Sequence, residues 1–422
     1  MLFRYFNNFY LYLLGLPRFW ELQQPLSTQI QQFYLNQIKK SSLTIGMEPV
    51  VHHIEICTSN IEKITKYFIE KLNFELAYVK ENQDIKQNAV KSGECILVIT
   101  KRVEKLVDSN GIVINCSKRE CNRDTVFNLA FAVKDIKLFC DNYVKAGGVI
   151  ITPCRTINDS FGSIQIAQVK SICGNVIHTL LNKSRYKGFL PGFRTVSIGC
   201  DNSLVDYMDH VTYVCETGQM DSVIEFYEKT FGMKRFMINR LDQPIDGLII
   251  GGSVGMKLKV MDYWKCAEAG LRTSGSRKIS IVLAESLPGQ ANSHIRTFLD
   301  EHGGPGIQHI GLHTKSIVPC VSRLHQNGVQ FRKPPEAYYS SVGKLDEIIA
   351  CGEDLAKFKQ LGILIDCEAD ASDPQTLPTN APKDDRYLLQ IFTLPVFDED
   401  TFFLEVIQRK VLQDLVLGML QL

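Results

Sequence analysis

The chain has 422 residues, 45% of them hydrophobic, with 47 basic and 46 acidic side chains and a formal net charge of +1. This length suffices for two or more domains, and the near-neutral charge excludes the strongly basic surface of proteins that bind nucleic acid or anionic membranes. Its 13 cysteines include no CxxC pair, which favours reduced thiols over a disulfide framework. No apolar run is long enough to span a bilayer, so we expect a soluble intracellular protein.

Residues 1–47 are predicted to be an N-terminal extension, because their composition differs from that of the rest. The segment is rich in aromatic residues and contains a single acidic residue, Glu21, before Met47. Scarcity of acids is typical of mitochondrial targeting segments. Two interpretations stay open: a targeting segment, which implies a mitochondrial location, or an upstream extension of a cytoplasmic protein whose fold begins at Met47.

Two kinds of sequence unit recur along the chain. Residues 50–78 and 208–236 both predict a strand, a short polar loop, a helix and a second strand. Residues 127–154 match 308–335, and in both a glycine ends the helix before an extended segment. A repeat of this kind decides the fold, and it predicts two homologous halves of two modules each.

Each module has the pattern βαβββ, so the predicted fold class is α+β. Tandem βαβββ modules resemble the vicinal oxygen chelate, or glyoxalase-like, superfamily, and the resemblance implies two open-barrel halves with a cup for a metal ion. The predicted boundaries are an N-terminal half without metal at 48–185, a linker at 186–204, a metal-binding catalytic half at 205–410, and an atypical C-terminal tail at 411–422.

Three ionisable residues of the second half occupy strand-like apolar runs. His210 and His309 open its two modules, and Glu405 lies within FFLEVI of its last strand. An unpaired carboxylate buried there would be strongly unfavourable. Two histidines and a carboxylate on three strands form the ligand set of non-haem iron(II) oxygenases, which leaves three coordination positions open.

The repeat provides a comparison within the chain. His53 is the counterpart of His210, whereas Asn128 and Thr179 stand at the positions of His309 and Glu405. The first half therefore keeps one of the three ligand types. Because an ion needs several convergent ligands, only the second half is predicted to bind one.

Structural roles are the alternative for each of these side chains. Glu405 could face solvent, but FFLEVI lacks the polar–apolar alternation of a half-exposed strand. His313 shares a strand face with His309 and is interpreted as structural. The same interpretation applies to His52, His178, His302 and His325.

Longer motifs narrow the resemblance. GGPGIQHIGLHTKSI (303–317), YLLQIFTLPVFDEDTFFLEVIQR (387–409) and GFLPGF (188–193) are similar to the 4-hydroxyphenylpyruvate dioxygenase family, and the similarity extends over residues 48–410. The resemblance implies Fe(II) bound by His210, His309 and Glu405. It also implies an aromatic 2-oxo acid and O2 as substrates, with oxidative decarboxylation and hydroxylation. An extradiol ring-cleaving dioxygenase is the enzymatic alternative with the same fold and ligand type.

The resemblance also assigns residues around the iron. It places Gln308 and Gln390 beside the ligands or on the substrate, Phe392 against the substrate ring, and Ser293 in the pocket wall. Amide donors and an apolar face suit the positioning of a phenol ring. From the residues alone, Phe392 would serve equally as core and Gln390 as a buried backbone partner. No nucleic acid and no membrane span are expected, and the resemblance allows a homodimer.

Some stretches are more similar to a paralogous animal branch of that family, namely IVLAESLPGQ (281–290), KPPEAYYSSVGK (333–344) and LGILID (361–366). Ala284 stands where the catabolic enzyme has Asn, and His294 where it has Gln. These departures fit that branch, for which the resemblance implies 4-hydroxymandelate as product, for the ubiquinone head group. The alternative is homogentisate, the product in tyrosine catabolism.

The tail at 411–422 departs from the family, which continues into a Gly-rich segment and a helix that covers the active site. Here the residues read VLQDLVLGMLQL from 411 onwards. Without a lid, water and substrate order would be less controlled. The expected effect is on turnover more than on metal binding, and a non-enzymatic scaffold is the corresponding alternative function.

Overall fold

The computed structural model describes residues 49–83, 85–103, 107–114, 123–197, 203–237, 242–251, 254–263, 279–289, 293–339, 348, 352–368 and 386–411. The predicted extension at 1–47 lies outside the described residues, as does the predicted tail beyond Val411. Within the described part, no helix is both long and apolar enough to cross a membrane.

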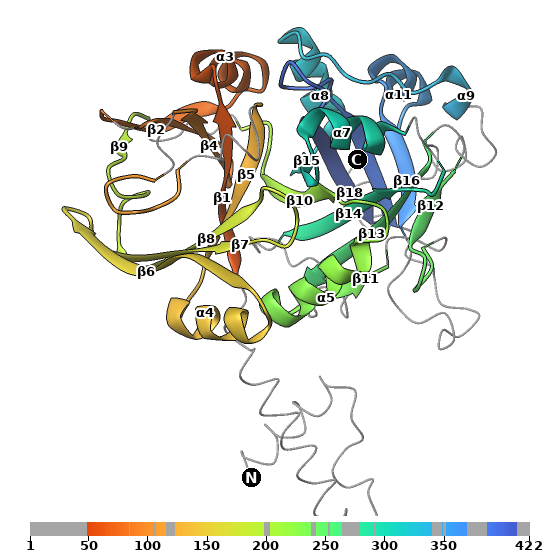
Figure 1. Ribbon diagram of the computed structural model, residues 1–422. Coiled ribbons are helices and arrows are strands. Elements are labelled where there is room, and N and C mark those ends of the chain that lie inside the picture. The colour runs from red at the N-terminus through yellow and green to blue at the C-terminus, as the bar shows by residue number, and fades with distance from the viewer. Residues whose placement is uncertain are drawn as a thin grey trace, which may run out of the picture. The chain divides into compact units, whose positions relative to one another are not determined.

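The first half forms one curled sheet from two βαβββ modules (Figure 1). The first module consists of β1 (Val50–Thr58), α3 (Ile61–Lys66), the π-helical turn η1 (Tyr67–Lys71), β2 (Glu75–Glu81), β3 (Lys86–Ser92) and β4 (Cys95–Lys101). The second consists of β5 (Thr125–Ala132), α4 (Ile136–Lys145), β6 (Val149–Asp159), β7 (Gly162–Lys170) and β8 (Ile177–Tyr186). In the described residues the strand order is β6-β7-β8-β5-β1-β4-β3-β2-β9. The short β9 (Arg194–Thr195), within the predicted linker range, pairs with β2.

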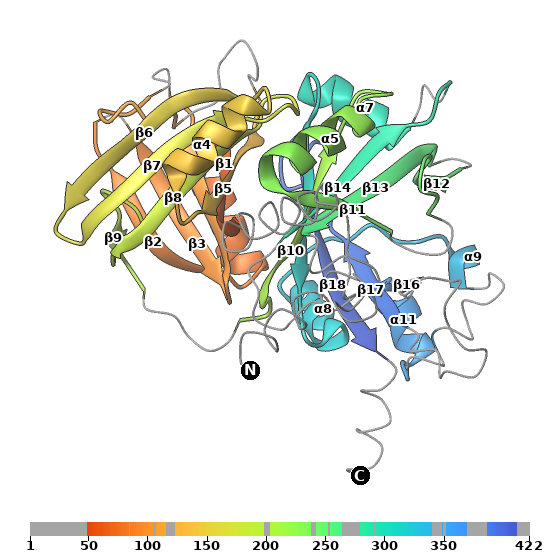
Figure 2. The same ribbon diagram turned by 90° about the horizontal axis from the view of Figure 1, so that it is seen from below.

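The second half repeats this plan (Figure 2). Its first module consists of β10 (Tyr207–Val214), α5 (Met220–Phe231), β11 (Met233–Phe236), β12 (Leu248–Ile250), β13 (Met256–Tyr263) and β14 (Ser280–Ser286), followed by α7 (His294–His302). Its second consists of β15 (Gly306–His313), α8 (Ile317–Gln326), α9 (Glu336–Tyr339), α11 (Leu355–Leu361), β16 (Leu364–Glu368), β17 (Arg386–Phe392) and β18 (Phe403–Val411). The described strand order is β11-β13-β14-β10-β15-β18-β17-β16, with β12 beside β13. The predicted α+β fold of tandem βαβββ modules is confirmed.

The module helices of the first half, α3 and α4, begin where a side-chain oxygen can satisfy the free backbone N–H groups of the first turn. Asn60 accepts a hydrogen bond from the backbone N–H of Lys63, and Asp135 accepts one from that of Leu138. Helix α5 ends at Gly232, whose φ of 71° is left-handed and therefore favours glycine. Helix α4 packs against β6, β7 and β8, and α8 packs against β18 (Figures 1 and 2). The helices thus cover one sheet face, which leaves the other face to form the cup.

The two halves share one hydrophobic core cluster, which includes Ile54, Phe131, Tyr213 and Tyr227. A buried hydrogen bond also joins them: His178 Nε2 lies 2.7 Å from the Tyr227 hydroxyl. Because the strands β5 and β15 contact one another, the two central strand pairs are packed together. The cups are therefore built on a common packed centre.

Each half carries a β-bulge on its first strand. The pairing of β1 with β5 slips between Val51 and His53, and that of β10 with β15 slips between Met208 and His210. A bulge inserts one extra residue and re-aims neighbouring side chains. The extra residues here are His52 and Asp209, and both precede a histidine of the cup.

Candidate metal centre

Three adjacent strands bring together the three residues that the sequence predicts as metal ligands. His210 lies on β10, His309 on β15 and Glu405 on β18, and the order in the sheet is β10-β15-β18. Their candidate ligand atoms all lie within 4.8 Å of one another. Glu405 Oε2 is 2.9 Å from His210 Nε2 and 3.5 Å from His309 Nε2. This is the one such group of His, Cys, Asp or Glu found among the described residues.

Two atoms of this group are buried without a hydrogen-bond partner in the described structure, namely Glu405 Oε1 and His309 Nδ1. The Glu405 residue is only 2% exposed. A buried carboxylate with one oxygen left unpaired is destabilising unless a cation compensates it. The donor set of two imidazoles and one carboxylate therefore suits a divalent transition metal such as iron(II).

The charge of the two histidines is set by their neighbours. Burial lowers the pKa of His210, but the carboxylates of Glu405 and Asp209 outweigh it and raise that pKa to about 9. Burial, together with the positive charges of His210 and His294, holds the pKa of His309 well below its usual range. The acids therefore draw positive charge to this spot, which a proton on His210 or a metal ion can supply.

Asp209, which the sequence analysis did not single out, orients His210. Its Oδ1 lies 3.1 Å from His210 Nδ1, and Arg409 on β18 donates to both of its oxygens at 3.0 and 3.2 Å. Adjacent residues normally face opposite sides of a strand, but the bulge at Asp209 brings this side chain to the histidine. A histidine held in this way keeps Nε2 pointed at the metal position.

Gly311 makes room for the His210 ring, a role that was not predicted from the sequence. It is paired with His210 across β10 and β15. A Cβ at Gly311 would lie 2.2 Å from Cε1 of the His210 imidazole. Only glycine leaves room for the ring to lie across the neighbouring strand. The sequence signal was the Gly in HIGLH, two residues after His309.

The structure places two of the predicted substrate residues beside the ligands. Phe392 is paired with Glu405 across β17 and β18, and its ring centroid is 6.2 Å from that of His309. Gln308 is the extra residue of a second bulge, is 4% exposed, and makes no side-chain hydrogen bond with the described residues. Its amide is therefore available to a ligand.

The other two predicted substrate residues have protein partners. Gln390 lies on the same face of β17 as Phe392, but its amide donates to Asp366 Oδ2 at 2.5 Å. Ser293 is the N-cap of α7, where its hydroxyl accepts from the backbone N–H of Arg296 and lies 2.9 Å from the Ser286 hydroxyl. The structure thus gives Ser293 a capping role. The next residue, His294, is close enough to lower the pKa of His309.

Strand register confirms the comparison between the halves. His53 pairs with Ala130 as His210 pairs with Gly311, and Asn128 sits on β5 as His309 sits on β15. Thr179 follows the partner of Asn128 by two residues, as Glu405 follows the partner of His309. In the first half Asn128 donates to the Thr179 hydroxyl at 2.8 Å, and no metal ligand set results among the described residues.

The remaining histidines have protein partners. His302 lies 2.9 Å from the Thr125 hydroxyl and 2.8 Å from the Gly304 carbonyl oxygen. His313 stacks on Tyr207 and lies 3.2 Å from Asp206. These contacts agree with the structural role expected of both.

The sequence matches the family model of the glyoxalase/bleomycin resistance protein/dioxygenase superfamily twice, over residues 50–178 and 207–345. The 4-hydroxyphenylpyruvate dioxygenase-like proteins of mouse and human are 32% and 33% identical to it, and each alignment covers 67% of this chain and 71% of the relative. The 4-hydroxyphenylpyruvate dioxygenase of Dictyostelium discoideum is 29% identical over 85% of this chain and 91% of its own.

Among solved structures, a variant of 4-hydroxymandelate synthase from Streptomyces coelicolor has the same fold. The TM-score is 0.65 at 23% identity, and the alignment covers 86% of this chain and 94% of that one. At this identity the likeness concerns the fold alone.

Proposed function

Because this chain belongs to the glyoxalase/bleomycin resistance protein/dioxygenase superfamily and, within it, to the 4-hydroxyphenylpyruvate dioxygenase-like proteins, we propose that it is a non-haem iron(II) dioxygenase acting on 4-hydroxyphenylpyruvate. The observation that carries the proposal is the buried group of His210, His309 and Glu405 on three adjacent strands. The names of the relatives support the substrate.

His210, His309 and Glu405 are the proposed iron ligands. Two histidines and one carboxylate leave three coordination positions for substrate and O2. Iron(II) held there would supply the Lewis acidity and the electrons for oxidative decarboxylation of a 2-oxo acid by O2. Asp209 would keep the His210 ring in its ligating orientation, because it accepts from Nδ1 and is itself held by Arg409.

The substrate ring would be positioned by the wall next to the ligands. Phe392 and Phe403 lie with their ring centroids 6.0 Å apart, and Phe403 is stacked 4.6 Å from the His309 imidazole. These rings exclude water from one side of the cup. Gln308 supplies an amide that the described residues leave unused, which could bind a polar substituent of the substrate.

The proposed product is 4-hydroxymandelate, in service of the ubiquinone head group. It rests on Ala284, which replaces the Asn of the catabolic enzymes. Ala284 is 1% exposed and packs in an apolar cluster with Val214, Ile295 and Phe298. A wall without a polar group there would not hold the substrate as the catabolic site does. Homogentisate is the alternative product.

Product analysis with iron-loaded protein tests the proposal. We expect 4-hydroxyphenylpyruvate and O2 to yield 4-hydroxymandelate and CO2, measured by mass spectrometry, and the Glu405→Ala variant to yield neither. Formation of homogentisate would refute the proposed product but still support the proposed dioxygenase activity. If no product forms and no iron binds, the catalytic function is contradicted and a scaffold remains.

A further inference from the structure

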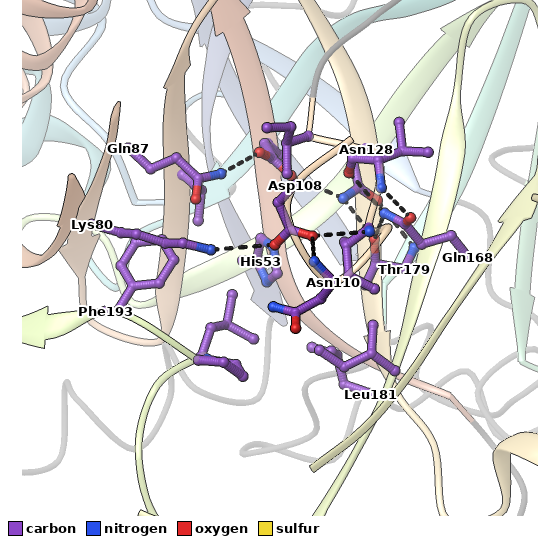
Figure 3. A pocket seen from close by; sticks show the side chains of 18 of the residues that line it. His53, Lys80, Gln87, Asp108, Asn110, Asn128, Gln168, Thr179, Leu181 and Phe193 are labelled. Atoms are coloured by element: carbon purple, nitrogen blue, oxygen red, sulfur yellow. Dashed lines mark hydrogen bonds and ion pairs between the residues drawn. The ribbon is translucent and has the colours of Figure 1, made fainter. Parts of the chain in front are cut away.

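The cup of the first half is hollow and separate from the metal centre. It contains a partly open cavity of about 60 Å³ lined by His53, Glu55, Lys80 and Asp108, with apolar walls that include Leu181 and Phe193 (Figure 3). A mostly apolar cavity with a few convergent polar groups is typical of a small-molecule site. None of these residues belongs to the proposed catalytic machinery.

A chain of hydrogen bonds fixes what His53 offers to the cavity. Lys183 Nζ lies 3.0 Å from His52 Nε2, and His52 Nδ1 lies 2.8 Å from His53 Nδ1. An ammonium group only donates, so His52 accepts at Nε2 and donates from Nδ1. His53 then accepts at Nδ1. Burial, with the charge of Lys183, lowers the pKa of His53 to about 3, so the neutral ring carries its proton on Nε2.

His53 therefore presents a fixed N–H donor. Its Nε2 has no hydrogen-bond partner among the described residues, although the residue is 3% exposed. Because His53 lines the cavity, this N–H can donate to an acceptor that enters it. That acceptor must meet the neighbouring charges as well.

Lys80 and Asp108 face one another across the cavity as a separated ion pair. Lys80 Nζ is 3.7 Å from Asp108 Oδ2, which is beyond hydrogen-bond distance, and the amine makes no hydrogen bond with the described residues. Asp108 Oδ1 accepts from the backbone N–H groups of Asn110 and Ile112 at 2.8 and 3.0 Å. These bonds hold the carboxylate in place, with Oδ2 turned toward the lysine.

Gln168 anchors the segment that carries Asp108. Its amide pairs with both backbone groups of Val113: the oxygen accepts at 2.6 Å and the nitrogen donates at 2.9 Å. Residues 107–114 are thereby attached to β7 as one wall of the cup. The second carboxyl of the cavity, Glu55, accepts from Gln87, Thr100 and Asn128. Burial raises its pKa despite these bonds.

We propose that the cup of the first half binds a small zwitterion, a free α-amino acid of the size of glycine or alanine. The ligand carboxylate accepts from Lys80 and from His53 Nε2, and the ligand ammonium donates to Asp108 Oδ2. A ligand of single charge would be attracted by one member of the Lys80–Asp108 pair and repelled by the other. The cavity volume of about 60 Å³ favours the smallest amino acids. The proposal is independent of the enzymatic function.

Calorimetric titration of the full chain, prepared without metal, tests the site. We expect glycine to bind with a dissociation constant below about 10 mM, and acetate and methylamine to bind at least about 10-fold more weakly. Asp108→Asn is the sharpest variant, because its Oδ1 can still accept from Asn110 and Ile112 while the charge opposite Lys80 is lost. Glycine should then bind at least about 10-fold more weakly.

Two control variants distinguish binding in this cup from binding elsewhere on the chain. Lys63→Met removes a lysine from an exposed ion pair with Asp398 and should leave glycine binding unchanged, as should Glu405→Ala in the other cup. Lys80→Met should weaken binding without loss of the folded state, checked by circular dichroism. The proposal is overturned if glycine shows no saturable binding, if acetate binds as well as glycine, or if Asp108→Asn leaves the affinity unchanged.

Discussion

His53 and His210 occupy the same register position in two copies of one module pair, yet their pKa values shift in opposite directions. Burial and Lys183 lower the pKa of His53 to about 3, whereas Glu405 and Asp209 overcome burial and raise that of His210 to about 9. The backbone around the two rings is the same. The charge of the ring is decided by which side chains stand at the bulge and on the last strand.

The two halves differ in the residue at the bulge and in the basic residue on the last strand that contacts it. In the first half His52 lies between His53 and Lys183, and in the second half Asp209 lies between His210 and Arg409. A neutral imidazole beside the cup histidine favours an uncharged ring, and a carboxylate favours a cation near it. The fold therefore provides the geometry of a cup, and a few substitutions decide whether the cup attracts a metal.

The largest effect is expected of Glu405→Thr, which gives the second half the residue that the first half has at the equivalent position, Thr179. An ion cannot be held by two histidines alone against water. We expect iron to fall from about one atom per chain to nearly none and turnover to fall by at least about 1,000-fold. Metal analysis and oxygen consumption measure both.

The matched control is Glu55→Gln in the first cup, which should leave the iron content unchanged. Full iron binding by Glu405→Thr would mean that the ligands lie elsewhere.

A second test concerns the pH dependence of stability and His178. This residue precedes Thr179 on β8, and its equivalent in the second half is Leu404, which precedes Glu405 on β18. Burial lowers the pKa of His178 to about 4, so the unfolded chain binds the proton more readily between about pH 6.5 and pH 4. The stabilisation is complete above about pH 6.5 and is lost as the pH falls toward 4, by about 3 kcal/mol.

In denaturant unfolding curves, His178→Leu should remove this part of the pH dependence of the unfolding free energy. A smaller dependence of the same sign should remain, because burial also lowers the pKa of His53. An unchanged difference in unfolding free energy between about pH 7 and pH 4.5 would contradict the assignment to His178.

Asp209→Asn should weaken metal binding by about 10- to 100-fold, since it removes the carboxylate that orients a ligating histidine. Metal titration of the purified variant measures the affinity. Asp206→Asn, which removes a carboxylate from His313 instead, should leave it unchanged. Equal losses in both variants would indicate a general effect of charge rather than orientation of His210.

The smallest change expected is that of Gly311→Ala, which copies Ala130. The added methyl group would displace the His210 ring, and overpacking of this kind is typically worth about 1 kcal/mol or more. We expect about 10-fold weaker metal binding. Gly251→Ala, where a Cβ would meet nothing within 4 Å, is the control. Unchanged metal affinity in Gly311→Ala would show that the ring has room to move.

The repeat made most of the fold predictable, because four similar units can bury their apolar faces in few ways. It also isolated His210, His309 and Glu405, since the other copy lacks two of them. The partners of these residues were not predictable in the same way. By the alternation of a strand, Asp209 would face away from His210. Only the bulge brings its side chain to the histidine, and the sequence does not show that bulge.

Contacts across long sequence distances were missed for a similar reason. Arg409 is a charged residue near the end of a strand, and nothing local connects it with Asp209, 200 residues earlier. Comparison of the repeats could have identified Arg409, because Lys183 is a basic residue at the equivalent position of the first half. The cap that Ser293 forms on α7 was also not predicted; its place in a pocket wall stays a prediction from the resemblance.

The arrangement of the ligands on β10, β15 and β18 has a consequence for biosynthesis. His210 and Glu405 are 195 residues apart (405 − 210), so at about 5–20 residues per second the ribosome takes roughly 10 to 40 s between them. During that interval the first cup is already translated, while the second has first one and then both of its histidines but not yet Glu405. Binding of the proposed iron would therefore be a late event in the life of the nascent chain, because it requires the last strand to be in place.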